Sequence, residues 1–356
     1  MKPVLPSFLH KLSPRHWVLV GLLLLVVLVQ HIPAWGACYA RTLYPLIARP
    51  LSFVSGLVPL AVGDLFIASS LLWMVAWPFY ARLRLQRSWR QTAGRMAEYL
   101  LWLYAWFYLA WGLNYSQPNF YQRTGIAYTP FEAEQFEHFA SDYIDSLNAA
   151  YLPVDQVDKE LVRRESIAGY RQLAGNMGVH TPFRDGLRVK TMLFSPFISM
   201  VGVTGSMGPF FCEFTVNADV LPADYPATYA HEMSHLLGIT SEAEANLYAY
   251  LVCTHSTVPE VKYSGYYSIL PHVLQNAQRL LPDSTYQQLP RRIRPEIVAQ
   301  LQSDHAYWSA KYSHLIGSIQ NQLYDWYLKG NRIESGRKNY SEVIGLLMSV
   351  RAGKQR

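Results

Sequence analysis

The chain has 356 residues, enough for one large domain or two of ordinary size. Only 16% of the residues are charged and 14% are aromatic, which is an apolar composition for a protein in water. The formal net charge of +6 comes from residues 1–115, where ten Lys and Arg stand against two acids, while the remaining residues have a net charge of −2. This distribution is typical of membrane topology and disfavours nucleic-acid binding.

Three apolar stretches, at about residues 17–35, 57–80 and 97–115, predict three transmembrane helices. Spanning takes about 20 mostly apolar residues, and Trp and Tyr gather at the ends of these stretches, as at the level of lipid headgroups. Residues 1–115 are therefore expected to form a membrane domain. Asp64 is expected near a helix end or against another helix, because an unpaired acid in hydrocarbon is costly.

The loop between the second and third stretches, ARLRLQRSWRQTAGR, contains five Arg and no acid. The positive-inside rule places this loop and the basic N-terminus in the cytoplasm, and residues 116–356 outside it. We therefore expect a multi-pass membrane protein with a cytoplasmic N-terminus and an extracytoplasmic C-terminal domain. Two alternatives stay open: the first stretch also fits a cleaved signal peptide, and the third also fits a buried helix of the outer part.

Residues 116–356 are expected to fold as a helix-dominated α+β domain with a small sheet. The predicted helices are 129–152, 157–178, 226–237, 242–256, 263–280, 293–327 (broken) and 339–351. Residues 187–194 and 210–218 are rich in β-branched and aromatic side chains and predict strands. The segment between them, 195–209, holds three glycines and two prolines and predicts a loop.

The three cysteines, Cys38, Cys212 and Cys253, show no CxxC spacing. Outside the cytoplasm, Cys212 and Cys253 could form a disulfide. Two buried free thiols are the alternative, and the sequence does not decide between them.

The segment TYAHEMSHLLGITSEAEAN, residues 228–246, contains an HExxH motif. Four residues apart on a helix, His231 and His235 project from one face and can both bind one Zn²⁺. Glu232 is rotated away from that edge and can approach a water beside the metal, which suits a general base. Apart from Glu232, no charged residue interrupts TYAHEMSHLL. The helix is therefore expected to be buried, where these side chains need partners.

The third metal ligand is expected on the next helix. Gly238 is placed to end the first helix, and Ser241 is placed to cap a second one that begins at Glu242. A tight turn between the two helices then sets Glu242 opposite His235. A site of two His and one Glu leaves the fourth position open for water, as in catalytic zinc sites.

The same turn sets Asn246 opposite His231, where its amide can hydrogen-bond a metal ligand without itself binding the metal. Helix starts are uncertain by a residue or two, so Glu244 remains an alternative to Glu242 as the third ligand.

HEMSH followed by EAEAN resembles the HExxH…E-x-x-A-D/N pattern of gluzincin metallopeptidases, in which the Glu of the second motif is the third zinc ligand. The gap of six residues between the motifs is much shorter than in gluzincins. More of the chain is similar to an uncharacterised bacterial family of membrane-anchored HExxH proteins of unknown function. Besides the HExxH segment, the resemblance is carried by VPLAVGD, WGLNY, MLFSPFISMVGVTG, PFFCEFTVN, YSGYYSIL and LYDWYLKGNRIESG. The resemblance implies that residues 116–356 form a zincin-like, zinc-peptidase-like α+β domain of a protein in a bacterial plasma membrane, but it implies no substrate.

Other candidate site residues flank the motif. In zinc peptidases a strand like FFCEFTVN lines the cleft and pairs with extended substrate, so Glu213 is expected either to bind a substrate amine or to be solvated. Tyr263 and Tyr266 are the expected donors to the oxyanion, with packed core aromatics as the alternative. The segment VGVTGSMGP is either a mobile flap or a turn-rich connection.

The sequence thus predicts a membrane-anchored zinc metallopeptidase that acts on peptide or protein substrates outside the cytoplasm. Zinc held by His231, His235 and Glu242 would activate a water, and Glu232 would carry its proton to the leaving amine. The alternative is a non-catalytic membrane protein whose structural metal stabilises an outer domain that binds a partner. Cleavage within the membrane is disfavoured, because the HExxH helix is short and lies in a polar domain.

Overall fold

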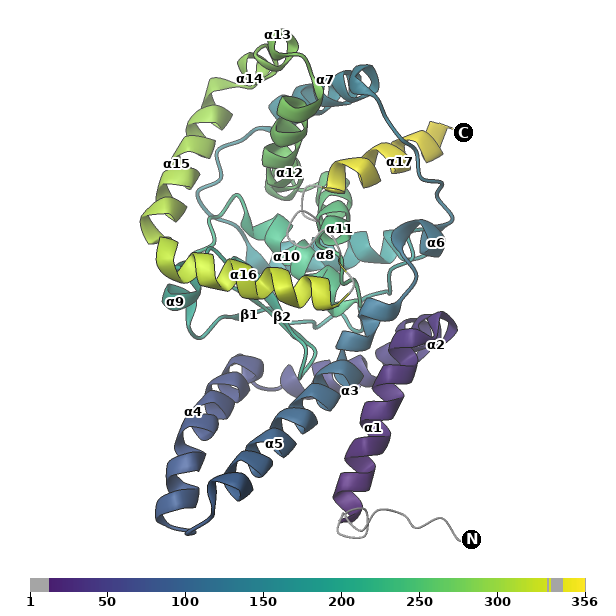
Figure 1. The fold of residues 1–356 in the computed structure, drawn as a ribbon. Helices are drawn as coiled ribbons and strands as arrows, with labels where there is room; N and C mark the ends of the chain where they lie inside the picture. The colour runs from purple at the N-terminus through teal and green to yellow at the C-terminus, as the bar shows by residue number, and fades with distance from the viewer. Residues whose placement is uncertain (1–12, 332, 334–341, 356) are drawn as a thin grey trace.

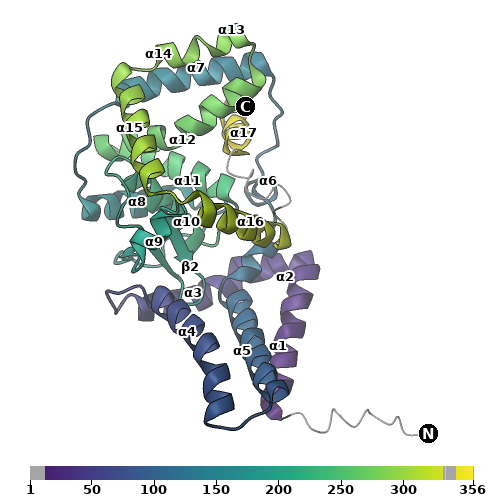
Figure 2. The same ribbon diagram turned by 60° about the vertical axis from the view of Figure 1, so that its left-hand side comes forward.

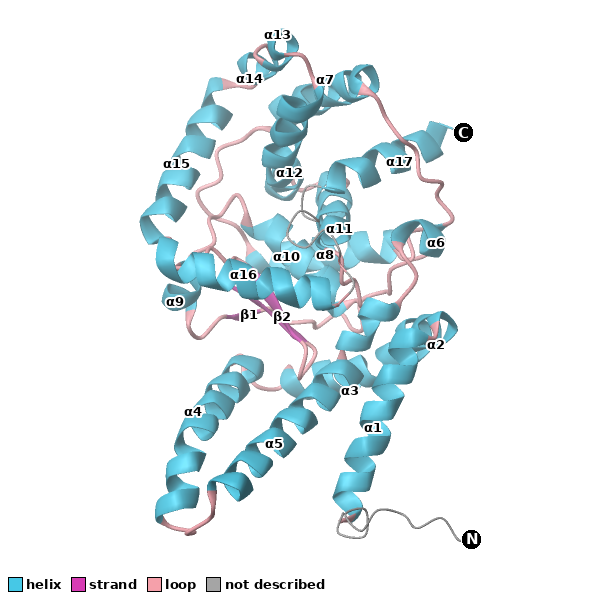
Figure 3. Cartoon of the chain, viewed as in Figure 1, coloured by secondary structure: helices cyan, strands magenta, loops and turns pink. Residues whose placement is uncertain are grey.

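The computed structural model describes residues 13–331, 333 and 342–355. The chain is mainly helical, and a small three-stranded mixed sheet lies in its larger, C-terminal part (Figures 1 and 3). This confirms the predicted class of a mainly α protein with a small sheet. Two views show three long helices, α1, α4 and α5, projecting from one side of the larger part (Figures 1 and 2).

The projecting helices follow the three apolar stretches of the sequence. They are α1 (Pro14–His31), α4 (Val62–Leu83) and α5 (Trp89–Ala110). Among the described residues, α1 and α4 are the two helices long and apolar enough to cross a membrane. The prediction of three such spans is wrong for α5, whose first half carries two arginines and a glutamate and leaves too short an apolar half.

Short helices connect the projecting helices to the larger part. They are α2 (Pro33–Cys38), the π-helix η2 (Tyr39–Leu43), α3 (Tyr44–Ser55), the 3₁₀-helix η3 (Gly112–Ser116) and α6 (Phe120–Thr124). In Figure 1, α2 and α3 lie between the long helices and the larger part.

The predicted helices of the larger part are present in the predicted order. Three short helices among the described residues are absent from the prediction, at Ser195–Ser199, Asp283–Tyr286 and Leu289–Arg292, and the first of them lies in the segment predicted as a loop. The helices of this part are α7 (Ala133–Ala150), α8 (Lys159–Leu173), α9 (Ser195–Ser199), α10 (Tyr225–Leu236), α11 (Glu242–Thr254), α12 (Pro259–Leu280), α13 (Asp283–Tyr286), α14 (Leu289–Arg292), α15 (Pro295–Lys311), α16 (His314–Gly330) and α17 (Val343–Gln355). The break expected within 293–327 falls between α15 and α16. Of the helix predicted at 339–351, residues 339–341 lie outside the described residues.

The sheet differs from the prediction because the strand within residues 210–218 is its central strand and not an edge strand. Its strands are β1 (Lys190–Thr191), β2 (Gly205–Gly208) and β3 (Glu213–Val216), in the order β1-β3-β2. β3 pairs in parallel with β1 and antiparallel with β2, so it is the central strand. β2 arises from the segment predicted as a loop. A peptide strand can add only to the edge of a sheet, so β3 cannot pair with a substrate strand as predicted.

A buried ion pair joins the sheet to the first turn of α4. Glu213 and Lys190 form an ion pair with 3% of each side chain exposed. The backbone N–H of Gly63 donates to Glu213 Oε1 at 2.5 Å, and Lys190 Nζ donates to the carbonyl oxygen of Ser55 at 2.8 Å. The prediction that Glu213 binds a substrate amine is therefore wrong, because the Lys190 ammonium already occupies this carboxylate.

Asp64 makes a second connection at the same place. It lies in the first turn of α4, as expected for an acid near a helix end, and accepts a hydrogen bond from the backbone N–H of Leu193 at 2.9 Å. The start of this candidate span is thus fixed to the segment that follows β1.

Replacing Lys190 with methionine should destabilise the protein by about 3–5 kcal/mol, because the carboxylate of Glu213 would remain buried without its partner. The change is measured as thermal unfolding of the full chain in detergent. Lys329→Met is the matched control, since Lys329 pairs with Asp325 at the surface and its loss should cost less than about 1 kcal/mol. Equal shifts in the two variants would refute a buried, structural ion pair.

The three cysteines are free thiols. Cys212 and Cys253 are buried, and burial raises the pKa of each thiol to about 12. The alternative of a disulfide between them is therefore excluded in this structure, and neither thiol is poised as a nucleophile.

Candidate metal centre

The HExxH motif and the segment after it form a tight helical hairpin. α10 ends at Leu236, and Gly238 turns the chain with a φ of 94°, a conformation that favours glycine. The hydroxyl of Ser241 then accepts a hydrogen bond from the backbone N–H of Glu244 and caps α11, which begins at Glu242. Both predicted helix boundaries are confirmed.

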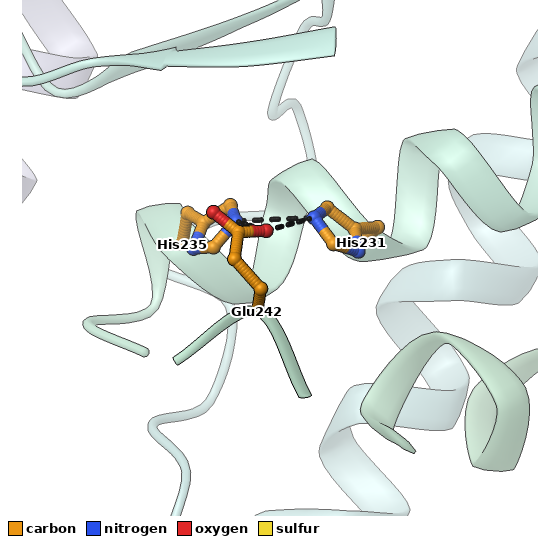
Figure 4. A group of neighbouring side chains, drawn as sticks. All are labelled: His231, His235 and Glu242. Carbon is orange, nitrogen blue, oxygen red and sulfur yellow. Dashed lines mark hydrogen bonds and ion pairs between the residues drawn. The ribbon is translucent and has the colours of Figure 1, made fainter. Parts of the chain in front are cut away.

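The hairpin brings His231, His235 and Glu242 together (Figure 4). The two Nε2 atoms lie 3.1 Å apart. Glu242 Oε2 lies 3.1 Å from Nε2 of His231 and 3.5 Å from Nε2 of His235. The ligand atoms all lie within 4.8 Å of one another, so the group could hold a metal ion.

The other nitrogen of each ring fixes its orientation. Nδ1 of His231 donates to Oδ1 of Asn246, and Nδ1 of His235 donates to the carbonyl oxygen of Ile239, both at 2.8 Å. In the neutral rings both Nε2 lone pairs therefore point at the carboxylate of Glu242. Three acceptors that face one another repel unless a cation lies between them. The side chains thus fit a metal ion of the kind that binds imidazole and carboxylate.

The pKa values of the group show the same preference for positive charge. Burial opposes ionisation of Glu242, yet the rings of His235 and His231 hold the pKa of its carboxyl well below the usual range. Burial also disfavours the charged form of His235, but the Glu242 carboxylate raises the pKa of that ring to about 9. The three side chains therefore stabilise a positive charge at their centre.

Glu232 lies beside this group without joining it. Its side chain is buried, and burial raises the pKa of its carboxyl, although the rings of His231 and His235 oppose the shift. A Cβ atom at Gly205 of β2 would lie only 2.4 Å from Glu232 Cγ and Oε1. The absence of a side chain at Gly205 therefore makes room for the glutamate.

The competing candidate for the third ligand, Glu244, lies elsewhere. Its carboxylate forms an ion pair with Arg123, and both side chains are almost buried. Glu242 and not Glu244 therefore faces the histidines.

The metal group opens into a cavity of about 880 Å³, called the central cavity below. Its walls come from α10, α11, α12 and α16, from η3, and from β2 with the loop before it. The segment VGVTGSMGP, for which a flap and a turn-rich connection were the alternatives, thus contributes both a loop and an edge strand to this wall. The cavity is large enough for a ligand of several residues.

Sequence reasoning missed Tyr324, which lies on α16. Its hydroxyl donates to Glu242 Oε1 at 2.7 Å and so holds the oxygen of Glu242 that does not face the histidines. Tyr324 follows Glu242 by 82 residues, and although it lies in LYDWYLKGNRIESG, a segment similar to the uncharacterised bacterial family, nothing in that segment points to a metal site.

The two tyrosines predicted as oxyanion donors do not line the central cavity. Tyr263 is fully buried in α12, and its hydroxyl donates to Gln300 Oε1 at 2.8 Å. The ring of Tyr266 packs against Tyr143 and Tyr250. Both match the alternative of packed core aromatics. His272, which follows these tyrosines on α12, does line the cavity.

Residues from the N-terminal part support the ligand helix. The hydroxyl of Tyr44 donates to the carbonyl oxygen of Leu236 at 2.6 Å, and the indole N–H of Trp111 donates to that of His235 at 2.9 Å. The bond from Tyr44 satisfies a carbonyl in the last turn of α10, and the bond from Trp111 adds to the one that His235 already accepts from the backbone N–H of Gly238. The ligand helix thus depends on residues on both sides of the boundary predicted at residue 115.

Asn246→Ala should lower the metal affinity of the site by about 10–100-fold, because the His231 ring would lose the acceptor that fixes its tautomer. The measurement is zinc binding to the full chain in competition with a chromogenic chelator. Asn246→Asp keeps an oxygen acceptor and should retain most of the affinity. An alanine variant that binds zinc like the wild type would contradict the role assigned to Asn246.

Asp224 in the cavity wall should make stability depend on pH. Burial, followed by the carboxylate of Asp304, raises the pKa of Asp224 from 3.8 to about 7. The folded protein then keeps a proton that the unfolded chain releases, so stability should fall as the pH rises from about 3.8 to about 7. Asp224→Asn should remove that fall in melting temperatures recorded across this range. An unchanged fall in the variant would assign it to other groups.

The chain was compared with protein families, curated proteins and solved structures. It matches the family described as "Protein of unknown function (DUF3810)" over residues 39–348, which is most of its length. The comparisons with curated proteins and with solved structures gave no match. The matched region contains the whole α10–α11 hairpin, β2 and α16. The chain therefore belongs to the DUF3810 family, whose function is unknown.

Proposed function

We propose that this protein is a membrane-anchored zinc metallopeptidase that hydrolyses peptide bonds outside the cytoplasm. The observation that carries the proposal is that two imidazole lone pairs and one carboxylate converge on one point. A fourth side chain, the buried Glu232, lies beside them and is not a ligand. Two His and one Glu leave a metal position open for water, whereas structural zinc sites fill all four positions with protein ligands.

His231, His235 and Glu242 would hold the zinc. When bound, zinc acts as a Lewis acid that lowers the pKa of a water and polarises a substrate carbonyl. Asn246 and the carbonyl of Ile239 keep the two rings in the tautomer that presents Nε2. Tyr324 restrains the carboxylate of Glu242 by its hydrogen bond to Oε1.

Glu232 is the proposed general base. Its burial and the resulting rise in its pKa suit a group that accepts a proton from the attacking water and returns it to the leaving amine. His272 is the proposed donor to the oxyanion, because it brings a ring N–H to the wall of the same cavity.

The edge strand β2 is the proposed platform for the substrate. Residues Gly205 to Met207 line the central cavity, and Gly205 lies directly against Glu232. An extended peptide that adds to β2 would therefore place its backbone beside the general base.

The proposed location follows from α1 and α4 together with the arginine-rich loop after α4. Both helices are long and apolar enough to span, and the side chains of Leu71, Leu72 and Val75 on α4 are each more than 60% exposed, as expected of a lipid-facing helix. The positive-inside rule then places the loop in the cytoplasm and the metal centre on the opposite side of the membrane.

Metal dependence tests the proposal. The full chain in detergent should hydrolyse members of a library of quenched fluorescent peptides, lose that activity when a chelator removes the metal, and regain it with added zinc. Retention of activity after verified metal removal would refute zinc-dependent hydrolysis.

A further inference from the structure

We propose that the outer face of α16 rests on the surface of the lipid bilayer, as a membrane contact separate from the spanning helices. Leu315, Ile319, Leu323 and Trp326 follow one another at steps of one helical turn and so share one face. Their side chains are between 54% and 73% exposed, and Ile316 beside them is 46% exposed. We call these five residues the α16 stripe.

The opposite face of α16 is already occupied by the protein. It contributes Tyr324 to the carboxylate of Glu242 and Tyr327 to the hydroxyl of Tyr115, and it lines the central cavity. The stripe takes no part in these contacts. A contiguous apolar stripe facing water is unfavourable and marks a surface that something else covers.

The C-terminal end of α16 contacts α5, which packs against both candidate spans, α1 and α4. Asn331, directly after α16, accepts a hydrogen bond from the hydroxyl of Tyr108 in the last turn of α5 at 2.9 Å. At the other end, the backbone N–H of Ser313 donates to the carbonyl oxygen of Met200, next to α9, whose Phe197 is also exposed. Figures 1 and 2 show α16 in the half of the larger part nearer to α1, α4 and α5, with β2 between α16 and those helices.

The composition of the stripe favours lipid over a protein partner. Trp is enriched at the level of lipid headgroups, and Trp326 lies at the end of α16 that contacts α5. Between Leu315 and Trp326 the one charged residue of α16 is Asp325, and it is paired with Lys329, the next cation along the helix. A helix with an apolar face and a polar edge lies in the plane of the interface.

The inference rests on the proposed anchoring by α1 and α4 but not on catalysis, so its test needs no substrate and no metal. The full chain with Cys38→Ser receives one cysteine at a time, at Ile319 in the stripe, at Leu72 in α4, or at Ser284 in α13. Leu72 reports anchoring, and Ser284 is the exposed control, because α13 lies at the far end of the molecule (Figure 1). Cys212 and Cys253 are buried and should not react with the label.

Each variant is labelled with an environment-sensitive fluorophore and placed in phosphatidylcholine nanodiscs, with or without bromine on the acyl carbons nearest the headgroup. We expect bromine to remove most of the fluorescence at Ile319 and Leu72 and none at Ser284. Quenching at Leu72 without quenching at Ile319 would overturn the inference and leave the anchoring intact. Loss of quenching at both sites would overturn both. Energy transfer between Ile319 labels of two chains, without lipid quenching, would show that a second copy covers the stripe and would also overturn the inference.

Discussion

Glu232→Gln should reduce peptide hydrolysis by at least about 100-fold while leaving the metal bound, because a general base typically contributes about 10²–10⁴-fold to the rate. Glutamine has the shape of glutamate and fits beside Gly205, but it cannot accept the proton of the attacking water. Glu232 is not a ligand, so zinc content should be unchanged. The measurements are initial rates with the peptide library and metal analysis of the same sample.

The matched control for this variant is Glu134→Gln, which changes an exposed glutamate in the first turn of α7. It should leave both activity and zinc content unaltered. The alternative function, a structural metal in a partner-binding scaffold, predicts that Glu232→Gln has no effect on function. A Glu232→Gln variant as active as the wild type would therefore favour the scaffold.

Glu242→Ala should lower zinc affinity by more than about 100-fold. Loss of a residue that only hydrogen-bonds a metal ligand already costs about 10–100-fold, and Glu242 is itself a proposed ligand. The substitution removes the one negative charge that faces both Nε2 atoms. Its buried carboxylate is also the acceptor for Tyr324, so the variant should lose the attachment of α16 to the metal centre. Competition with a chromogenic chelator measures the affinity.

Glu244→Ala is the matched control, two residues along the same helix. It removes the ion pair with Arg123 and should lower the melting temperature, yet it should retain zinc. The reverse pattern, with zinc lost in Glu244→Ala and kept in Glu242→Ala, would show that the hairpin holds the metal differently.

The metal centre was largely predictable because its geometry is local. His231 and His235 are one turn apart on one helix, and the glycine turn and serine cap between the helices fix where Glu242 falls. Asn246 follows from the same spacing. These relations need only helix periodicity and capping chemistry, so a single sequence is enough.

The errors concern features set by distant contacts. Residues 205–208 read as a loop because glycine has low β-propensity, but they form a strand by pairing with β3 and leave space for Glu232. Glu213 read as a free carboxylate, although its partner Lys190 lies on the neighbouring strand. Tyr324 reaches the site from a helix far along the chain. In each case the partner is brought close only by the tertiary fold.

The zinc content of the purified full chain decides whether His231, His235 and Glu242 form a zinc site. The N-terminal part must be kept, because Tyr44 and Trp111 support the ligand helix. Mass-spectrometric metal analysis, beside the His231→Ala and Glu242→Ala variants, should find one zinc per wild-type chain and little in either variant. A folded wild-type protein that binds no zinc when it is supplied, or variants that bind as much as the wild type, would contradict the account.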